Sequence, residues 1–224
     1  MRAYLEPILA LVWKDILLEL RTKDIVVSVL VFSFLVIVVF NFAIEPSPAN
    51  VGIVAPGVLW IAYIFGGVLG LTRSFGLERD SGNLRGLMLS PVSRDAIFFG
   101  KMLANFLFMM LVELMVFPVF AVLFNLPLWQ PELLPIAMLA TLGISTIGTL
   151  FSAMAVSTRA REVMLPLLFL PAAVPIIIAA VETTGLVLRE QELTDLAAWL
   201  PLMAAFDAVF LVVCPVAFHF VVED

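Results

Sequence analysis

The sequence has few charged residues, one cysteine and one histidine. Charged side chains make up 13% of its 224 residues, about half the share found in a typical globular protein. The single cysteine, Cys214, excludes an internal disulfide, and one histidine with one cysteine makes a zinc site of ordinary ligation unexpected. The net charge of −6 argues against nucleic-acid binding, which needs a basic surface.

Motifs of nucleotide and catalytic sites are also missing from the sequence. Gly100-Lys101-Met102 lacks the earlier glycine and the hydroxyl residue of a phosphate-binding P-loop. We find no haem-attachment motif, no HExxH zinc motif and no nucleophile elbow. The sequence therefore predicts a chain that is not itself an enzyme.

Apolar residues are abundant, at 63% of the chain with a mean hydropathy of +1.15. A helix needs about 20 apolar residues to cross a bilayer. Stretches that satisfy this requirement are 25–44, 51–72, 102–124, 133–158, 163–181 and 199–222. We therefore predict an all-α membrane protein with a single domain of six transmembrane helices over 25–222. Residues 1–24 are predicted as a cytoplasmic, amphipathic interfacial helix, the alternative being an extension of the first span.

The positive charges lie almost entirely on one side of the predicted spans. Of the 12 Lys and Arg residues, Arg189 alone falls in a connection on the other side. The other residues precede the first span, follow the second span or follow the fourth span. Arg159 and Arg161 are the two that follow the fourth span. By the positive-inside rule, both termini are predicted to be cytoplasmic.

The long cytoplasmic connection over 73–101 contains a predicted short helix. Leu84, Leu87 and Met88 share one face, Pro91 ends the helix, and Ser93 caps the helix that leads into the third span. An apolar face with no partner in the chain suggests a docking element for a soluble protein, although a loop lying on the membrane surface is an alternative. The candidate coupling residues are Glu78, Arg79, Asp80, Gly82, Leu84, Leu87, Met88 and Pro91.

Two acidic residues fall inside predicted spans, Glu113 in the third and Asp207 in the sixth. Intramembrane acids are candidates for function, so a gate, subunit contact or polar path is one interpretation. The other is an interhelical contact, with Asn105 or the hydroxyl-rich fourth span as partner. His219 lies near the cytoplasmic boundary and is interpreted as an interfacial residue rather than a haem ligand.

Small residues and prolines mark two further features. The fourth span repeats small residues every four positions, which suits bundle packing or a subunit interface; they are Thr141, Ser145, Thr149, Ala153 and Ser157. Pro166, Pro171 and Pro175 predict a kinked fifth span. The kink is either a gating element or a static bend.

Two segments resemble a known family. Glu78-Arg79-Asp80-Ser81-Gly82-Asn83-Leu84, with Met88-Leu89-Ser90-Pro91 and Gly100-Lys101, resembles the signature of ABC-2 type transporter permeases. Residues 159–171, with Pro175 following, resemble the CcmB family, haem exporter protein B of cytochrome c maturation. Length, six spans and cytoplasmic termini agree with that family.

The resemblance implies a permease subunit in the bacterial inner membrane whose coupling region fits a groove of a CcmA-like ATPase. It implies CcmC-like and CcmD-like membrane partners and a CcmE-like haem chaperone. The implied function is release of the haem-loaded chaperone on the periplasmic side, or export of haem to that side. ATP would bind to the partner and haem would be handled within the complex. The tryptophan-rich haem motif of CcmC is absent, so no cofactor is assigned to this chain.

Two other functions fit the composition. One is a proton-coupled secondary transporter that uses Glu113 and Asp207 as proton carriers, and the other is an assembly subunit that transports nothing. Secondary transporters usually contain internal repeats, and we find none here. The apolar helix predicted at 84–88 favours the ATPase-coupled permease.

Overall fold

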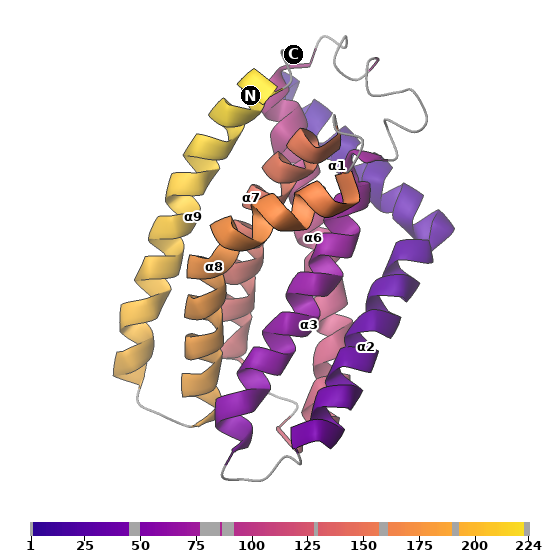
Figure 1. The fold of residues 1–224 in the computed structure, drawn as a ribbon. Coiled ribbons are helices and arrows are strands. Elements are labelled where there is room, and N and C mark those ends of the chain that lie inside the picture. Colours follow the sequence, from indigo (N-terminus) through magenta and orange to yellow (C-terminus); the bar gives the residue numbers. More distant parts are fainter. Residues whose placement is uncertain are drawn as a thin grey trace.

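The computed structural model describes residues 2–44, 50–76, 86, 92–127, 130–156, 161–189 and 193–221. Its regular elements are all helices in these ranges, as predicted. They are α1 (Arg2–Thr22), α2 (Asp24–Ile44), α3 (Val51–Ser74), α6 (Arg94–Leu123), α7 (Leu133–Val156), α8 (Arg161–Leu188) and α9 (Leu193–Val221). Figure 1 shows the last six arranged as a bundle, with α1 across one end. We call this the α1 end.

Six of the helices are long and apolar enough to cross a membrane, which confirms the predicted number of spans. They cover Asp24–Ile44, Val51–Thr72, Arg94–Leu123, Leu133–Val156, Val163–Leu188 and Ala198–Val221. The chain is therefore a multi-pass membrane protein. Because an even number of spans returns the chain to its starting side, α1 begins and α9 finishes at the same end of the bundle (Figure 1).

Three helices extend well beyond the predicted spans, and one of them, α9, begins at Leu193 rather than at position 199. α6 begins eight residues before the predicted start at position 102, because Ser93 caps it: the Ser93 hydroxyl accepts a hydrogen bond from the Ala96 N–H at 3.3 Å. This confirms the predicted cap. α8 continues past position 181 to Leu188. There Thr184 is buried and accepts a hydrogen bond from the Trp60 indole N–H at 3.0 Å, so tertiary packing prolongs the helix.

α1 packs along the first turns of α6. Ile8 and Val12 form a small buried cluster with Ala96 and Ala104 of α6. Between these alanines lies Gly100, where a β-carbon would stand 3.0 Å from Leu11 Cβ. Small residues at every fourth position thus allow the two backbones to approach closely.

The outward side of α1 is also partly apolar. Leu5, Leu9 and Trp13, spaced four residues apart, are all exposed. An apolar stripe of this kind, on a helix that is not a spanning segment, suits the headgroup region of a bilayer. α1 then turns into α2 at Lys23, whose φ of 56° is left-handed. The Glu19 carboxylate bridges the turn by accepting the Val26 N–H at 3.1 Å.

The interior of the bundle is formed by α3 and α7, which are the most buried of the candidate spans and also have the lowest hydropathy. α7 contacts α3, α6, α8 and α9. Its small polar residues, including Thr141, Ser145 and Thr149, are buried within this single chain. That placement agrees with the bundle-packing interpretation of the four-residue repeat.

Gly148 of α7 provides a test of this packing. A β-carbon there would overlap the Leu71 side chain of α3, whereas one at Gly57 of α3 would meet nothing within 4 Å. We expect Gly148→Ala to destabilise the protein by about 1–3 kcal/mol through overpacking. Gly57→Ala should be neutral or stabilising by up to about 1 kcal/mol, because alanine is the better helix former. Thermal unfolding in detergent measures both, and equal shifts would contradict the packing argument.

The proline-rich helix α8 is continuous from Arg161 to Leu188, with Pro166, Pro171 and Pro175 inside it. Figure 1 shows that α8 changes direction between its part near α1 and the rest of its length. A proline in a helix interior removes one backbone hydrogen bond and displaces the preceding turn. Both interpretations of the bend, a gating element and a static bend, stay predictions.

Candidate functional site

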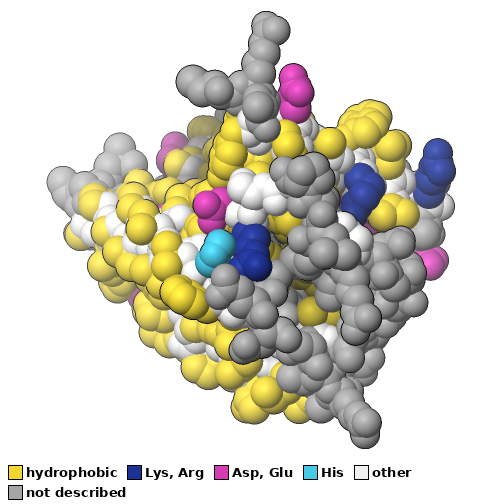
Figure 2. Space-filling model, turned by 90° about the horizontal axis from the view of Figure 1, so that it is seen from above, with side chains coloured by type: hydrophobic (Ala, Val, Ile, Leu, Met, Phe, Trp, Pro, Cys, Tyr) yellow, Lys and Arg dark blue, Asp and Glu magenta, His cyan; other side chains and the backbone are white. Residues whose placement is uncertain are grey.

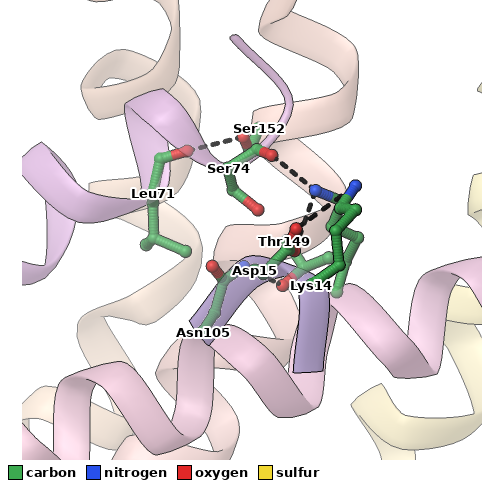
Figure 3. Close-up of polar contacts among 8 residues, drawn as sticks. Lys14, Asp15, Leu71, Ser74, Asn105, Thr149 and Ser152 are labelled. Atoms are coloured by element: carbon green, nitrogen blue, oxygen red, sulfur yellow. Dashed lines mark hydrogen bonds and ion pairs between the residues drawn. The ribbon is translucent and has the colours of Figure 1, made fainter. Parts of the chain in front are cut away.

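A buried lysine joins three helices at the α1 end. Lys101 of α6 is 1% exposed, and its ammonium lies 2.9 Å from Asp15 Oδ2 of α1. The same ammonium donates a hydrogen bond of 2.8 Å to the carbonyl of Ser74, the last residue of α3. Figure 3 shows this polar junction between the helices. Removing one partner of a buried ion pair is strongly unfavourable, so this pair opposes separation of α1 from α6.

An aromatic ring lies beside the lysine and packs against further rings. The lysine ammonium lies 5.3 Å from the ring centroid of Phe75, the residue that follows α3. The Phe218 ring contacts Phe75 at 5.9 Å and Phe98 at 5.5 Å between centroids, and all three rings are buried. These contacts fix the end of α3 against α6 and α9, and the cation–π contact adds a further attraction.

A second layer of polar contacts connects the junction to α7. The Ser152 hydroxyl donates to the Leu71 carbonyl of α3 at 2.6 Å, and the Asn105 amide of α6 donates to the Thr149 hydroxyl at 2.8 Å (Figure 3). In lipid, such interhelical hydrogen bonds are worth about 0.6–2 kcal/mol each. α7 is therefore bonded to both helices that flank the connection 77–91.

The predicted coupling residues themselves lie outside the described residues. They are Glu78, Arg79, Asp80, Gly82, Leu84, Leu87, Met88 and Pro91. The structure describes the two ends of their connection, Ser74 to Gly76 and Val92 onward. The first end is held by Lys101 through the Ser74 carbonyl and the Phe75 ring, and the second end leads into α6, the helix that carries Lys101. At the start of α6, Arg94 also donates to the His219 carbonyl of α9 at 3.0 Å.

Glu113 lies in the bundle interior, on α6. It is 5% exposed, and its Oε1 accepts a hydrogen bond from the Thr141 hydroxyl of α7. The Tyr63 hydroxyl of α3 donates to the Glu113 carbonyl at 3.3 Å. Glu113 Oε2 has no hydrogen-bond partner among the described residues. The acid therefore contacts the hydroxyl-rich fourth span, as one of the two interpretations anticipated, while Asn105 bonds to Thr149 instead.

Asp207 lies on the other side of α7. It is 3% exposed, and neither carboxylate oxygen has a hydrogen-bond partner within the described part of the chain. A β-carbon on Gly143 of α7 would meet Asp207 Oδ1, so glycine is required for this close approach. Positions 141 and 143 lie about 200° apart around a helix. α7 therefore separates the two intramembrane acids, and they do not form one site.

Other predicted residues lie apart from these contacts. Arg161 is the first residue of α8, and Arg159 lies outside the described residues. His219 is exposed in the last turn of α9, and the described residues contain no group of three metal-ligating side chains. Seen from the α1 end, the described basic side chains lie among hydrophobic surface and do not form a single patch (Figure 2).

Sequence reasoning missed the pair of Asp15 and Lys101. Lys101 was interpreted as a loop residue at the edge of the third span, whereas it lies inside α6. The signal that was available is the Ser93 cap, which places Lys101 eight positions into a helix. A charge on the apolar part of that helix needs a partner, and Asp15 on the amphipathic α1 is a suitable one.

Comparison with known proteins identifies the family. The family described as CcmB protein matches residues 6–223. Heme exporter protein B of Rhodobacter capsulatus is 30% identical over 212 residues, covering 93% of this chain and 94% of that protein. Heme exporter protein B of Haemophilus influenzae is 29% identical over 183 residues, covering 80% and 82% of the two chains. This six-span membrane protein belongs to the CcmB family.

Proposed function

We propose that this chain is the membrane permease subunit of an ATP-driven, haem-handling complex of cytochrome c maturation. Its function is to couple ATP hydrolysis on a separate CcmA-like subunit to release of a haem-loaded, CcmE-like chaperone, or to haem export, on the periplasmic side. The family match and the names of its relatives support this role. CcmC-like and CcmD-like membrane subunits complete the proposed complex, in the bacterial inner membrane with the α1 end in the cytoplasm.

The anchoring at Lys101 is the structural observation that carries the proposal. The connection 77–91 is the proposed docking segment for the ATPase, and it joins the end of α3 to α6, two helices that Lys101 bonds to each other. Lys101 joins α6 to the end of α3 and to α1 through contacts of 2.8 and 2.9 Å. Motion of the docking segment would therefore displace α3, α6 and α1 together rather than being absorbed by a flexible hinge.

α7 is the proposed route from the junction to the far side. Its hydrogen bonds through Ser152 and Thr149 connect it to α3 and α6, and its contacts with Glu113 and Asp207 lie deeper in the bundle. The bent α8 also contacts α7. ATP shifts the membrane part between two conformations only if the ATPase binds them unequally, and the docking segment is where that difference would arise.

Co-purification with the ATPase tests the docking segment. We expect Leu84→Asp combined with Leu87→Asp to lower the affinity by about a hundredfold, because each carboxylate would lose water on entering the groove. The matched control is Leu84→Met with Leu87→Met, which keeps an apolar face of similar size and should bind normally. Undiminished binding of the double aspartate variant would contradict the docking assignment.

A further inference from the structure

A cavity of about 330 Å³ opens between α1, α2, α3 and α6 at the α1 end. Its volume is at the lower limit for sites that hold small molecules. It lies at the corner where the non-spanning α1 turns into the spanning α2, which is the depth of lipid headgroups. The proposed permease function assigns no role to this cavity.

One end of the cavity is polar and contains charges of both signs. Asp15, Glu19, Ser74, Lys101 and Asn105 line it. The Ser74 hydroxyl is buried and has no hydrogen-bond partner in the described part of the chain. A buried hydroxyl without a partner is unfavourable, so Ser74 would gain a hydrogen bond if its side chain rotated to turn the hydroxyl toward a ligand in the cavity.

The other end of the cavity is apolar and open to the surroundings of the bundle. Its lining residues are Leu18, Ile25, Val26, Leu107, Phe108 and Leu111. Leu107 and Leu111 are each 40% exposed, so the apolar end meets the face of α6 that looks outward to the bilayer. An occupant with a polar head and an apolar tail can therefore enter from the lipid.

We propose that this cavity binds the headgroup region and first acyl carbons of one zwitterionic aminophospholipid, such as phosphatidylethanolamine. The lipid phosphate accepts hydrogen bonds from the Ser74 hydroxyl and faces the Lys101 ammonium. The lipid ammonium faces Asp15 and Glu19. An anionic lipid would set its uncompensated charge against these two carboxylates, so both signs are needed in the headgroup.

The acyl chain extends from this headgroup along Leu107 and Leu111 into the bilayer. Because the site touches α1, α3 and α6, the bound lipid fills the space beside the Lys101 junction. Binding of this lipid requires the membrane location of the chain but not its partner ATPase. It can therefore be measured even if the proposed permease function is wrong.

Native mass spectrometry of the full chain from nanodiscs tests the site, with equal phosphatidylethanolamine and phosphatidylglycerol in the bilayer. We expect the wild type to retain one phosphatidylethanolamine. Leu107→Trp fills the apolar end and should lower this retention about tenfold, the equivalent of losing the apolar contacts of a few methylenes. Leu114→Trp is the matched control, because Leu114 is 72% exposed on the same helix and lies outside the cavity lining.

Glu19→Gln provides a second variant, one that keeps the hydrogen bond from Val26 to position 19. Glutamine can still accept the Val26 N–H, but it removes one negative charge from the cavity. We expect the preference for phosphatidylethanolamine over phosphatidylglycerol to fall about fivefold, which is the upper range for the loss of one solvent-exposed ion pair. Equal retention of the two lipids by the wild type, or equal retention by Leu107→Trp and Leu114→Trp, would overturn the proposal.

Discussion

Asp15→Ala is expected to lower the stability of the protein by about 3–5 kcal/mol, the range measured when a buried ion pair loses one partner. The substitution removes the carboxylate that lies 2.9 Å from Lys101 Nζ, and the Lys101 side chain is only 2% exposed. Lys101 would keep its contact with the Ser74 carbonyl. A carbonyl does not neutralise an ammonium, so the buried Lys101 would lose the stabilisation of a carboxylate at 2.9 Å in a medium of low dielectric constant.

Lys14 offers a matched control because it contacts the same carboxylate. Its ammonium lies 3.3 Å from Asp15 Oδ1, but its side chain is 41% exposed. Lys14→Ala should therefore cost no more than about 1 kcal/mol. Replacing both Asp15 and Lys101 with methionine should restore much of the lost stability, since an apolar pair often substitutes well for a buried ion pair.

The apparent melting temperature in detergent measures these differences. For a chain of this size, the loss at Asp15→Ala corresponds to a decrease of about 10 °C. Equal shifts for Asp15→Ala and Lys14→Ala would show that burial of Lys101 does not set the energy of the pair. A double methionine variant that is less stable than Asp15→Ala would lead to the same conclusion.

Glu113→Gln is expected to reduce cytochrome c maturation to below about a tenth of the wild-type level, a loss that corresponds to at least about 1.4 kcal/mol in the coupled step. Glutamine keeps an acceptor oxygen for the Thr141 hydroxyl. It cannot bear a negative charge or exchange a proton, and its amide places two donors where Glu113 Oε2 has no hydrogen-bond partner among the described residues. Haem staining of c-type cytochromes in cells that express the variant measures the effect.

Thr141→Val separates the hydrogen bond from the acid. It removes the donor to Glu113 while keeping the shape of the side chain, so it should cost about 1 kcal/mol of stability and leave maturation largely intact. Recovery of the complex by affinity purification from the same cells shows whether Glu113→Gln acts on assembly or on coupling. Full maturation with Glu113→Gln would reduce Glu113 to an interhelical contact.

The six spans were predictable because bilayer thickness imposes one length and one composition on every crossing helix. The start of α6 was also predictable, because the Ser93 cap and the first turn of the helix depend only on residues that are neighbours in the sequence. The contact of Glu113 with the fourth span was anticipated in kind, since a buried acid needs a donor and that span is rich in hydroxyls. The specific donor, Thr141, was not predictable.

The junction at Lys101 was not predictable because it depends on how α1 lies across α6. Asp15 and Lys101 are far apart in the chain, and no periodic pattern connects them. Their meeting requires the approach at Gly100 together with the left-handed turn at Lys23. The predicted coupling residues belong to a different category, since they lie outside the described residues and stay predictions.

The contrast between buried and peripheral spans has a consequence for biogenesis. The interior helices α3 and α7 have the lowest hydropathy of the six, whereas α2 has the highest and is among the least buried. A helix leaves the protein-conducting channel according to its own affinity for lipid. α7, with its threonines, serines and glycines, gains least from lipid and most from its neighbours, so its stable insertion depends on α3 and α6 being already in place. The chain is synthesised in that order.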